Sequence, residues 1–365
     1  MDPKPNRPQN RELFRQPLNE LIDLKHPLVR LSTLIDWSRA EMLAAKHFKS
    51  HTGRPAASPR LIAGLLYLQH AFDLSDEAVV SGWTENPYWQ MFTGETYFQT
   101  KPPIEASSLT RWRQRLGEAG VAELLSMTVD ASLRCQAVKQ NSLKTVIVDT
   151  TVMPKAIAYP TDSRLLERAR KQLVKEAAAL GLSLRQNYNR KCPQLALQAG
   201  RYAHARQYKR MHKTLSVLRC RVGRVWRDID RQREKITGAA RVKLDQLMHL
   251  TRRILDQKPK DKNKLYALHA PEVECIGKGK ARTPYEFGVK VSVTTTLKEG
   301  LVVGMKSLPG NPYDGHTLEG ALEQAKNLTG QPIHTAVVDR GYKGVEIPDV
   351  RILRSGQKRE VLRAP

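Results

Sequence analysis

Residues 144–160, KTVIVDTTVMPKAIAYP, are the stretch that decides the fold. The uninterrupted apolar run of Val146, Ile147 and Val148 predicts a strand that is buried on both faces. Asp149 follows this run directly, and a proline five residues later is expected to end the strand. A carboxylate at the end of a buried strand lies at the edge of the core, where a metal ion or a substrate can reach it.

A second apolar run ends in the same way, because residues 335–338, TAVV, are followed by Asp339. Period-two alternation and helical spacing predict further strands at residues 285–296, 301–308 and 350–353 and an amphipathic helix at 315–328. The result is an α/β (α+β) fold with a mixed sheet and a crossover helix. Such a connection places the strands of Asp149 and Asp339 side by side.

Two neighbouring aspartates predict a metal site. Like charges disfavour joint ionisation, so two close carboxylates need a cation at neutral pH. Carboxylate oxygens suit hard divalent ions, which makes Mg²⁺ or Mn²⁺ the expected cofactor. Two such ions can activate a water or a 3′-hydroxyl and stabilise the leaving oxygen of a phosphoryl transfer. Asp149 and Asp339 are therefore the predicted catalytic residues and metal ligands.

The charge of the chain points to a polyanionic partner. The 365 residues carry a net charge of +25. Residues 1–143 hold 17 Lys and Arg against 15 Asp and Glu, whereas residues 164–264 hold 28 against 8, a net +20. A basic enzyme that is merely soluble does not need its positive charge concentrated in one segment. This concentration therefore favours contact with a nucleic-acid backbone. The predicted DNA-binding residues are Arg111, Arg113, Arg115, Arg219, Arg221, Arg224 and Arg227.

The basic segment has helical periodicity. Residues 208–229 carry apolar side chains in steps of three and four, and the remaining positions are mostly Arg and Lys. Gly238 is expected to end this helix, and residues 244–254 repeat the pattern. The two predict a helical hairpin with an apolar inner seam and a basic exterior. A further helix is predicted at residues 164–180.

Other segments are predicted from local composition. Ser107 and Ser108 are expected to cap a helix at residues 111–116, and residues 121–140 form the next one. Residues 1–10 have a disordered composition, and residues 51–54 form a linker-like turn. The four cysteines form no CxxC pair and are expected to be reduced thiols. No apolar run reaches membrane-spanning length, and no secretory leader is visible, so we expect a cytoplasmic, nucleoid-associated protein without membrane contact.

Several ordered blocks of the sequence resemble one protein family. VDTTVMPKAIAYPTDSRLL around Asp149, YEFGVKVSV, GNPYDGHTL and VVDRGYKG around Asp339 are similar to the catalytic blocks of bacterial insertion-sequence DDE transposases of the insertion-sequence-five group. LFRQPLNELIDLKHPLVRLSTLIDW and SSLTRWRQRLGE resemble the N-terminal helical domain of that group. The resemblance covers almost the whole chain in the right order.

The resemblance implies a ribonuclease-H-like catalytic fold, Mg²⁺ dependence, and cutting and joining of double-stranded DNA at transposon terminal inverted repeats and target sites, with self-association on DNA. It makes Asp149 and Asp339 the first two members of an acidic triad, with auxiliary roles at most for His316 and Tyr342. The implied domains are an N-terminal helical DNA-binding domain at 1–140, a catalytic domain at 141–159 plus 266–365, and the basic insertion at 160–265.

The third acidic residue of the triad has no clear match. The family carries a Glu on a helix beyond the second Asp, whereas Glu346 is too close to Asp339 and Glu360 leaves no room for that helix. The expectation is a truncated or frameshifted transposase with an incomplete metal site. The alternative is a non-catalytic DNA-binding remnant or inhibitor of transposition. An unrelated ribonuclease-H-like nuclease would explain the aspartates but not the N-terminal blocks.

Overall fold

The computed structural model describes residues 15–45, 56–277 and 284–356. The predictions for residues 1–10, residues 51–54 and Glu360 lie outside these ranges. The chain divides into two compact units. The first comprises residues 1–149, 293–306 and 318–365, and the second comprises 150–292 and 307–317. The mixed sheet and the helices confirm the predicted α/β (α+β) class.

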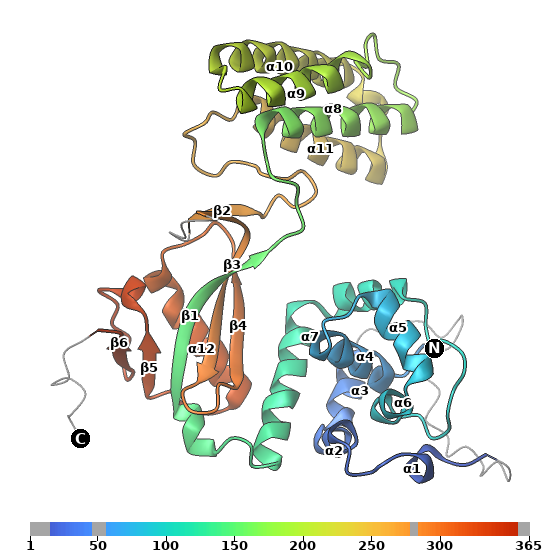
Figure 1. Cartoon of the computed structure of the whole chain (residues 1–365), viewed down its shortest axis with the longest axis vertical. Coiled ribbons are helices and arrows are strands. Elements are labelled where there is room, and N and C mark those ends of the chain that lie inside the picture. The colour runs from blue at the N-terminus through green and yellow to red at the C-terminus, as the bar shows by residue number, and fades with distance from the viewer. Residues whose placement is uncertain (1–14, 46–55, 278–283, 357–365) are drawn as a thin grey trace. The chain divides into compact units, whose positions relative to one another are not determined.

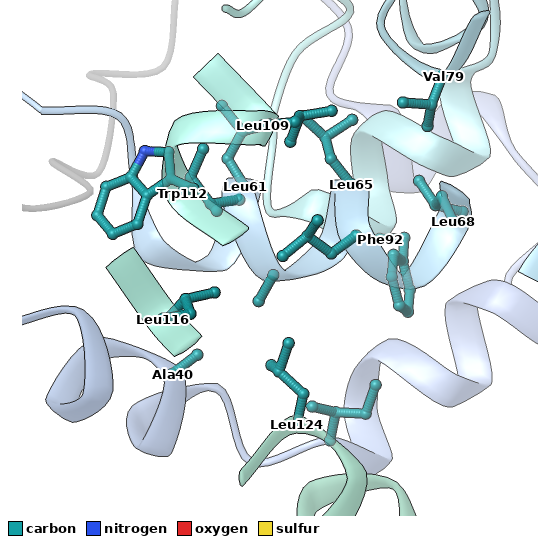
Figure 2. Packing of buried hydrophobic residues seen from close by; sticks show 14 of the residues in the cluster. Ala40, Leu61, Leu65, Leu68, Val79, Phe92, Leu109, Trp112, Leu116 and Leu124 are labelled. Atoms are coloured by element: carbon teal, nitrogen blue, oxygen red, sulfur yellow. The ribbon is translucent and has the colours of Figure 1, made fainter. Parts of the chain in front are cut away.

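The first unit begins with six helices, of which α3, α5 and α6 pack against α4. Their bounds are α1 Leu18–Leu21, α2 Pro27–Leu34, α3 Trp37–Ala45, α4 Pro59–Ala71, α5 Asp76–Glu85 and α6 Pro87–Thr93. The α4 helix is buried nearly all round, and its Leu61, Leu65 and Leu68 meet Phe92 of α6 and Leu109 of the following helix (Figure 2). A helix that is apolar on every side can lie only inside a core.

Helix α7, Ser107–Arg134, is one long element with a break at Gly117. The break has φ 59° and ψ −161°, a conformation that glycine adopts readily because it lacks a Cβ. It separates the two helices predicted from the sequence. The predicted cap by Ser107 and Ser108 is wrong, because Ser107 is already helical and its predecessor, Ala106, makes no side-chain capping bond.

Six strands form the sheet, in the order β2–β3–β1–β5–β6, with β4 also pairing with β3. Their bounds are β1 Thr145–Pro154, β2 Glu274–Gly277, β3 Tyr285–Thr296, β4 Val302–Leu308, β5 Thr335–Val338 and β6 Arg351–Arg354 (Figure 1). The β1–β5 and β5–β6 pairs are parallel and the β2–β3 pair is antiparallel. The predicted strands are confirmed, as is the side-by-side placement of β1 and β5. Only β2 was not predicted, because its four residues, ECIG, are too few to show the alternation of apolar and polar residues that is typical of a strand.

In the first unit one face of the sheet packs against the crossover helix α12, Leu318–Thr329. Val146 and Val148 of β1 are fully buried there, together with Ala336 of β5 and Leu318 of α12. The second half of α7 adds Val129 to this core. The sheet and the N-terminal helices are therefore joined through a shared helix.

The second unit contains four helices, shown together in Figure 1. They are α8 Asp162–Ala179, α9 Lys191–His204, α10 Tyr208–Asp230 and α11 Gly238–Asp256. The predicted hairpin is thus half of a four-helix group. Helix α9 escaped prediction because its buried positions, Cys192 and Ala199, are small and give a weak apolar signal. Gly238 does not end α10, which stops at Asp230; with φ 66° it begins α11 instead.

A polar network ties three helices of the first unit together. Arg113 of α7 donates from Nη1 and Nη2 to the two carboxylate oxygens of Asp76 in α5, at 2.8 and 2.6 Å. Thr110 of α7 and Gln69 of α4 donate to the same carboxylate. The hydrogen bond from Arg113 is the main cause that lowers the pKa of Asp76 from 3.8 to about 2.

All four cysteines lie in the described residues and are free thiols, as predicted. None of the helices in the described ranges combines the length and the hydropathy needed to cross a bilayer.

We expect Gly288→Ala in β3 to lower the free energy of unfolding by about 1–3 kcal/mol, because the added Cβ would overlap the carbonyl oxygen of Met153 in β1. Urea unfolding measures the change. Gly277→Ala in β2 is the matched control, since its Cβ would meet only Pro284 O at 4.0 Å. Equal losses for the two variants would contradict a steric cause at Gly288.

We expect Asp76→Asn to destabilise the protein at neutral pH by about 1–2 kcal/mol, because the charged hydrogen bond to Arg113 is lost. The folded-state pKa is lowered, so the carboxylate stabilises the protein above about pH 4 and loses this effect as the pH falls towards 2. The difference in Tm between wild type and variant should therefore shrink across that window.

Circular dichroism melts at a series of pH values measure this difference. The control is Asp73→Asn, an exposed aspartate three residues earlier. A difference for Asp76→Asn that stays constant from neutral pH to the acid end would show that its charge does not stabilise the fold.

Candidate functional site

Asp149 lies within β1, and Asp339 is the residue that directly follows β5. The register pairs Val148 with Val338, and each aspartate is the next residue of its chain segment. Neighbouring strands lie about 4.8 Å apart, so the two backbones are close at this point. Val148 and Val338 are buried, and both aspartates are exposed. Because side chains alternate along a strand, Asp149 faces away from the α12 core that buries Val148, and Asp339 directly follows the buried Val338.

Asp339 is fixed by its own turn. Its Oδ1 accepts a hydrogen bond of 2.8 Å from the backbone N–H of Gly341 and caps the short 3₁₀ helix η4, Arg340–Tyr342. Tyr342 at the end of that turn is fully buried in the sheet core. The aromatic ring anchors the turn that carries Asp339, which gives Tyr342 a positioning role that its place in the sequence did not reveal.

The DGH segment forms another 3₁₀ turn, η3 Asp314–Thr317, in which the aspartate makes the polar contacts. Asp314 Oδ1 accepts from Thr150 Oγ1 at 2.8 Å and pairs with Lys290 Nζ at 2.5 Å. His316 is exposed and its ring packs edge-on against Tyr313. Sequence reasoning singled out His316 and missed Asp314 and Lys290. The signal for them was Lys290, the one basic residue of β3.

Asp149 and Asp339 could supply two carboxylates to a divalent metal ion. Their oxygens suit Mg²⁺ or Mn²⁺, which are commonly held by one or two carboxylates with water and phosphate oxygens. Within residues 15–45, 56–277 and 284–356, no group of three or more His, Cys, Asp or Glu is placed to hold a metal ion. Glu346 is exposed in the segment between η4 and β6. The donor set fits an ion that shares its remaining positions with water and substrate.

The three arginines predicted on α7 have different surroundings. Arg113 is half-buried and held by Asp76. Arg111 is exposed and reaches back to Ser107, with Nη2 at 3.1 Å from Oγ. Arg115 is exposed and lies over the Trp112 ring at 5.5 Å from its centroid. Arg111 and Arg115 remain accessible to a ligand, whereas the guanidinium of Arg113 is committed to the fold.

The four arginines predicted on α10 also differ in exposure and in their contacts. Arg219 is half-buried and points towards Gln257 O, 3.5 Å away. Arg221 lies over the ring of Tyr188, and Arg224 Nη1 is 3.4 Å from the hydroxyl of the same tyrosine. Arg224 and Arg227 are exposed. The loop that carries Tyr188 was not connected with these arginines by any sequence signal.

Comparison with known proteins assigns the N-terminal helices to a protein family. The family model described as "Transposase domain (DUF772)" matches residues 16–115, which contain α1–α6 and the start of α7. A protein of Rhizobium meliloti described as "Uncharacterized protein ORF8 in nfe locus" is 48% identical over 207 residues, which are 56% of this chain and 100% of that protein. No solved structure matches the chain. The matched domain and the extensive likeness to the Rhizobium protein show that this chain belongs to the transposase-domain family, as its sequence blocks predicted.

Proposed function

We propose that the chain is an insertion-sequence transposase that binds transposon-end DNA and cleaves and transfers its strands with Mg²⁺ or Mn²⁺ held by Asp149 and Asp339. The observation that supports this proposal is the register of β1 and β5, which pairs Val148 with Val338, the residues that directly precede the two aspartates. The transposase-domain family supports a role in transposition.

The pair of aspartates suits phosphoryl transfer for electrostatic reasons. Two carboxylates on adjacent strands repel each other unless a cation lies between them. A bound divalent ion would supply positive charge to the attacking and leaving oxygens of a phosphodiester. Both side chains are exposed, so a DNA strand can approach them directly.

The chain holds these two side chains on rigid supports. Asp149 belongs to the continuous ten-residue strand β1, in which the preceding Val146 and Val148 are buried in the sheet core. Asp339 is oriented by its hydrogen bond to Gly341 and by the buried ring of Tyr342. Sites on such elements keep their geometry better than sites on loops, which matters when two ligands must meet one ion. The sheet would then serve as the ribonuclease-H-like catalytic core.

DNA binding would come from exposed arginines on two parts of the chain. Arg111 and Arg115 of α7 are accessible in the helical domain, and Arg224 and Arg227 are accessible on α10. The surrounding segment 164–264 has 28 basic residues against 8 acidic ones. A charge that is already paired adds little to the binding of DNA phosphates. Because Arg113 pairs with Asp76, it is expected to stabilise the fold more than it contributes to DNA binding. Transposon-end and target DNA, with self-association on DNA, are the proposed partners.

A second candidate function is DNA binding without strand cleavage. The observation that favours it is that no third metal-binding residue joins the two aspartates in the described part of the chain. Such a protein would occupy transposon ends without cutting them and could inhibit transposition.

We expect Asp149→Ala and Asp339→Ala each to reduce strand cleavage of transposon-end DNA by roughly 100-fold or more, because each removes a direct metal ligand. Duplex binding should stay unchanged, because neither aspartate attracts a polyanion. Gel-based cleavage in Mg²⁺ or Mn²⁺ and fluorescence anisotropy with a labelled duplex measure the two properties. Thermal stabilisation by Mn²⁺ gives an independent readout of the metal site.

The matched control is Glu346→Ala, which removes an exposed carboxylate of the same unit and should leave cleavage and stabilisation by Mn²⁺ as in the wild type. Binding without any cleavage by the wild-type chain would favour the second candidate. Cleavage that persists in both aspartate variants would refute the proposed site.

A further inference from the structure

A small, positively charged pocket lies where the α8–α9 loop meets α10 in the second unit. Its volume is about 220 Å³. It is lined by Arg185, Gln186 and Tyr188 of the loop and by Arg224, Arg227, Asp228 and Arg231 at the C-terminal end of α10. Four arginines and one aspartate give this lining a net charge of +3.

The loop is held rigidly from beneath by Arg170 of α8, whose side chain is 3% exposed. Its guanidinium pairs with Glu167 and donates to Asn187 O at 2.9 Å and to Asn189 Oδ1 at 2.5 Å. On the other side Gln232 donates to Ser183 O at 2.8 Å. The loop wall of the pocket is therefore formed before any ligand arrives, which reduces the entropic cost of binding.

Asp228 joins the loop to α10 at the pocket wall. Its Oδ2 accepts from the backbone N–H of Arg185 at 2.7 Å, and its Oδ1 accepts from Arg231 at 2.9 Å. Burial acts to raise the pKa of Asp228, but these hydrogen bonds and the neighbouring arginines outweigh it, and the pKa is lowered. The carboxylate thus stays charged and offsets one of the four arginines.

The other arginines retain unused hydrogen-bonding capacity. Among the described residues, the guanidinium of Arg227 makes no hydrogen bond or ion pair. Arg224 makes only a long hydrogen bond, 3.4 Å, to the hydroxyl of Tyr188. Like charges that converge on one hollow raise its free energy unless an anion enters. The planar guanidinium fork matches the oxygens of a phosphate group.

We propose that this pocket binds a backbone phosphate of double-stranded DNA and so fixes the duplex on the helical insertion. The inference rests on the proposed function, because it assumes that the chain binds DNA. The pocket is open to solvent and belongs to the segment with the highest basic charge, which suits a phosphate carried on a long polyanion.

The test compares two double variants of the full chain with equal loss of charge. Arg224→Gln/Arg227→Gln changes the pocket. Arg168→Gln/Arg201→Gln changes exposed arginines on α8 and α9 that do not line it. Duplex affinity is measured by fluorescence anisotropy at a series of salt concentrations. The pocket variant should lose about tenfold or more in affinity and reduce the salt slope by about one, whereas the control should lose less than about threefold.

A second pair of variants adds charge instead of removing it. Gln186→Glu puts a carboxylate at the pocket and should weaken binding, and Gln194→Glu on the exposed surface of α9 should have a smaller effect. Circular dichroism melts check that each variant is folded, and the charge-adding pair replaces the first pair if the double variant is not.

The outcomes distinguish a failure of the proposed phosphate pocket from a failure of the proposed DNA-binding function. A wild-type chain that binds no duplex at any salt concentration overturns the proposed function and the pocket with it. Equal effects of pocket and control variants, with wild-type binding intact, overturn only the pocket. Inorganic phosphate that raises the wild-type Tm but not that of Arg224→Gln/Arg227→Gln, without a difference in DNA affinity, would assign the pocket to a free anion and overturn its role in DNA binding.

Discussion

The parallel pairing of β1 with β5 is the constraint on which the rest of the first unit depends. Because side chains alternate along a strand, one register buries Val148 and Val338 against α12, turns Asp149 to the opposite face and leaves Asp339 directly beyond the paired residues. A slip of β1 by one residue would bury Asp149 and expose Val148. Core stability and the proposed chemistry therefore select the same register.

Much of this architecture could be predicted from the sequence, namely wherever a periodic pattern of apolar residues was long enough to define a strand or helix. The β-branched run before Asp149 and the alternation of β3 predicted their strands correctly, since each pattern spans enough residues to define a face. Helix α9 was missed because alanine and cysteine fill its buried positions. The cap assigned to Ser107 and the end assigned to Gly238 failed because both residues can occupy more than one position at a helix terminus.

The candidate site was predictable in part for a related reason. The two aspartates could be paired from topology, because parallel strands end at one edge of a sheet. The arginines could not be sorted by sequence, since a guanidinium that pairs with Asp76 and one left open beside Tyr188 look alike in a list of residues. The environment of an arginine depends on loops and partners that are distant in the chain, such as the segment that Arg170 holds in place.

Helix α7 has a thermodynamic consequence for the whole first unit. Leu109 and Trp112 belong to the core of the N-terminal helices, and Val129 of the same helix belongs to the core of the sheet. Ser126 further donates to Leu328 O at the end of α12. Loss of order in either core removes packing from an element that the other core needs, so the two are expected to unfold as one cooperative block. A mutation in the N-terminal helices would thus change the fraction of molecules in which the sheet is ordered.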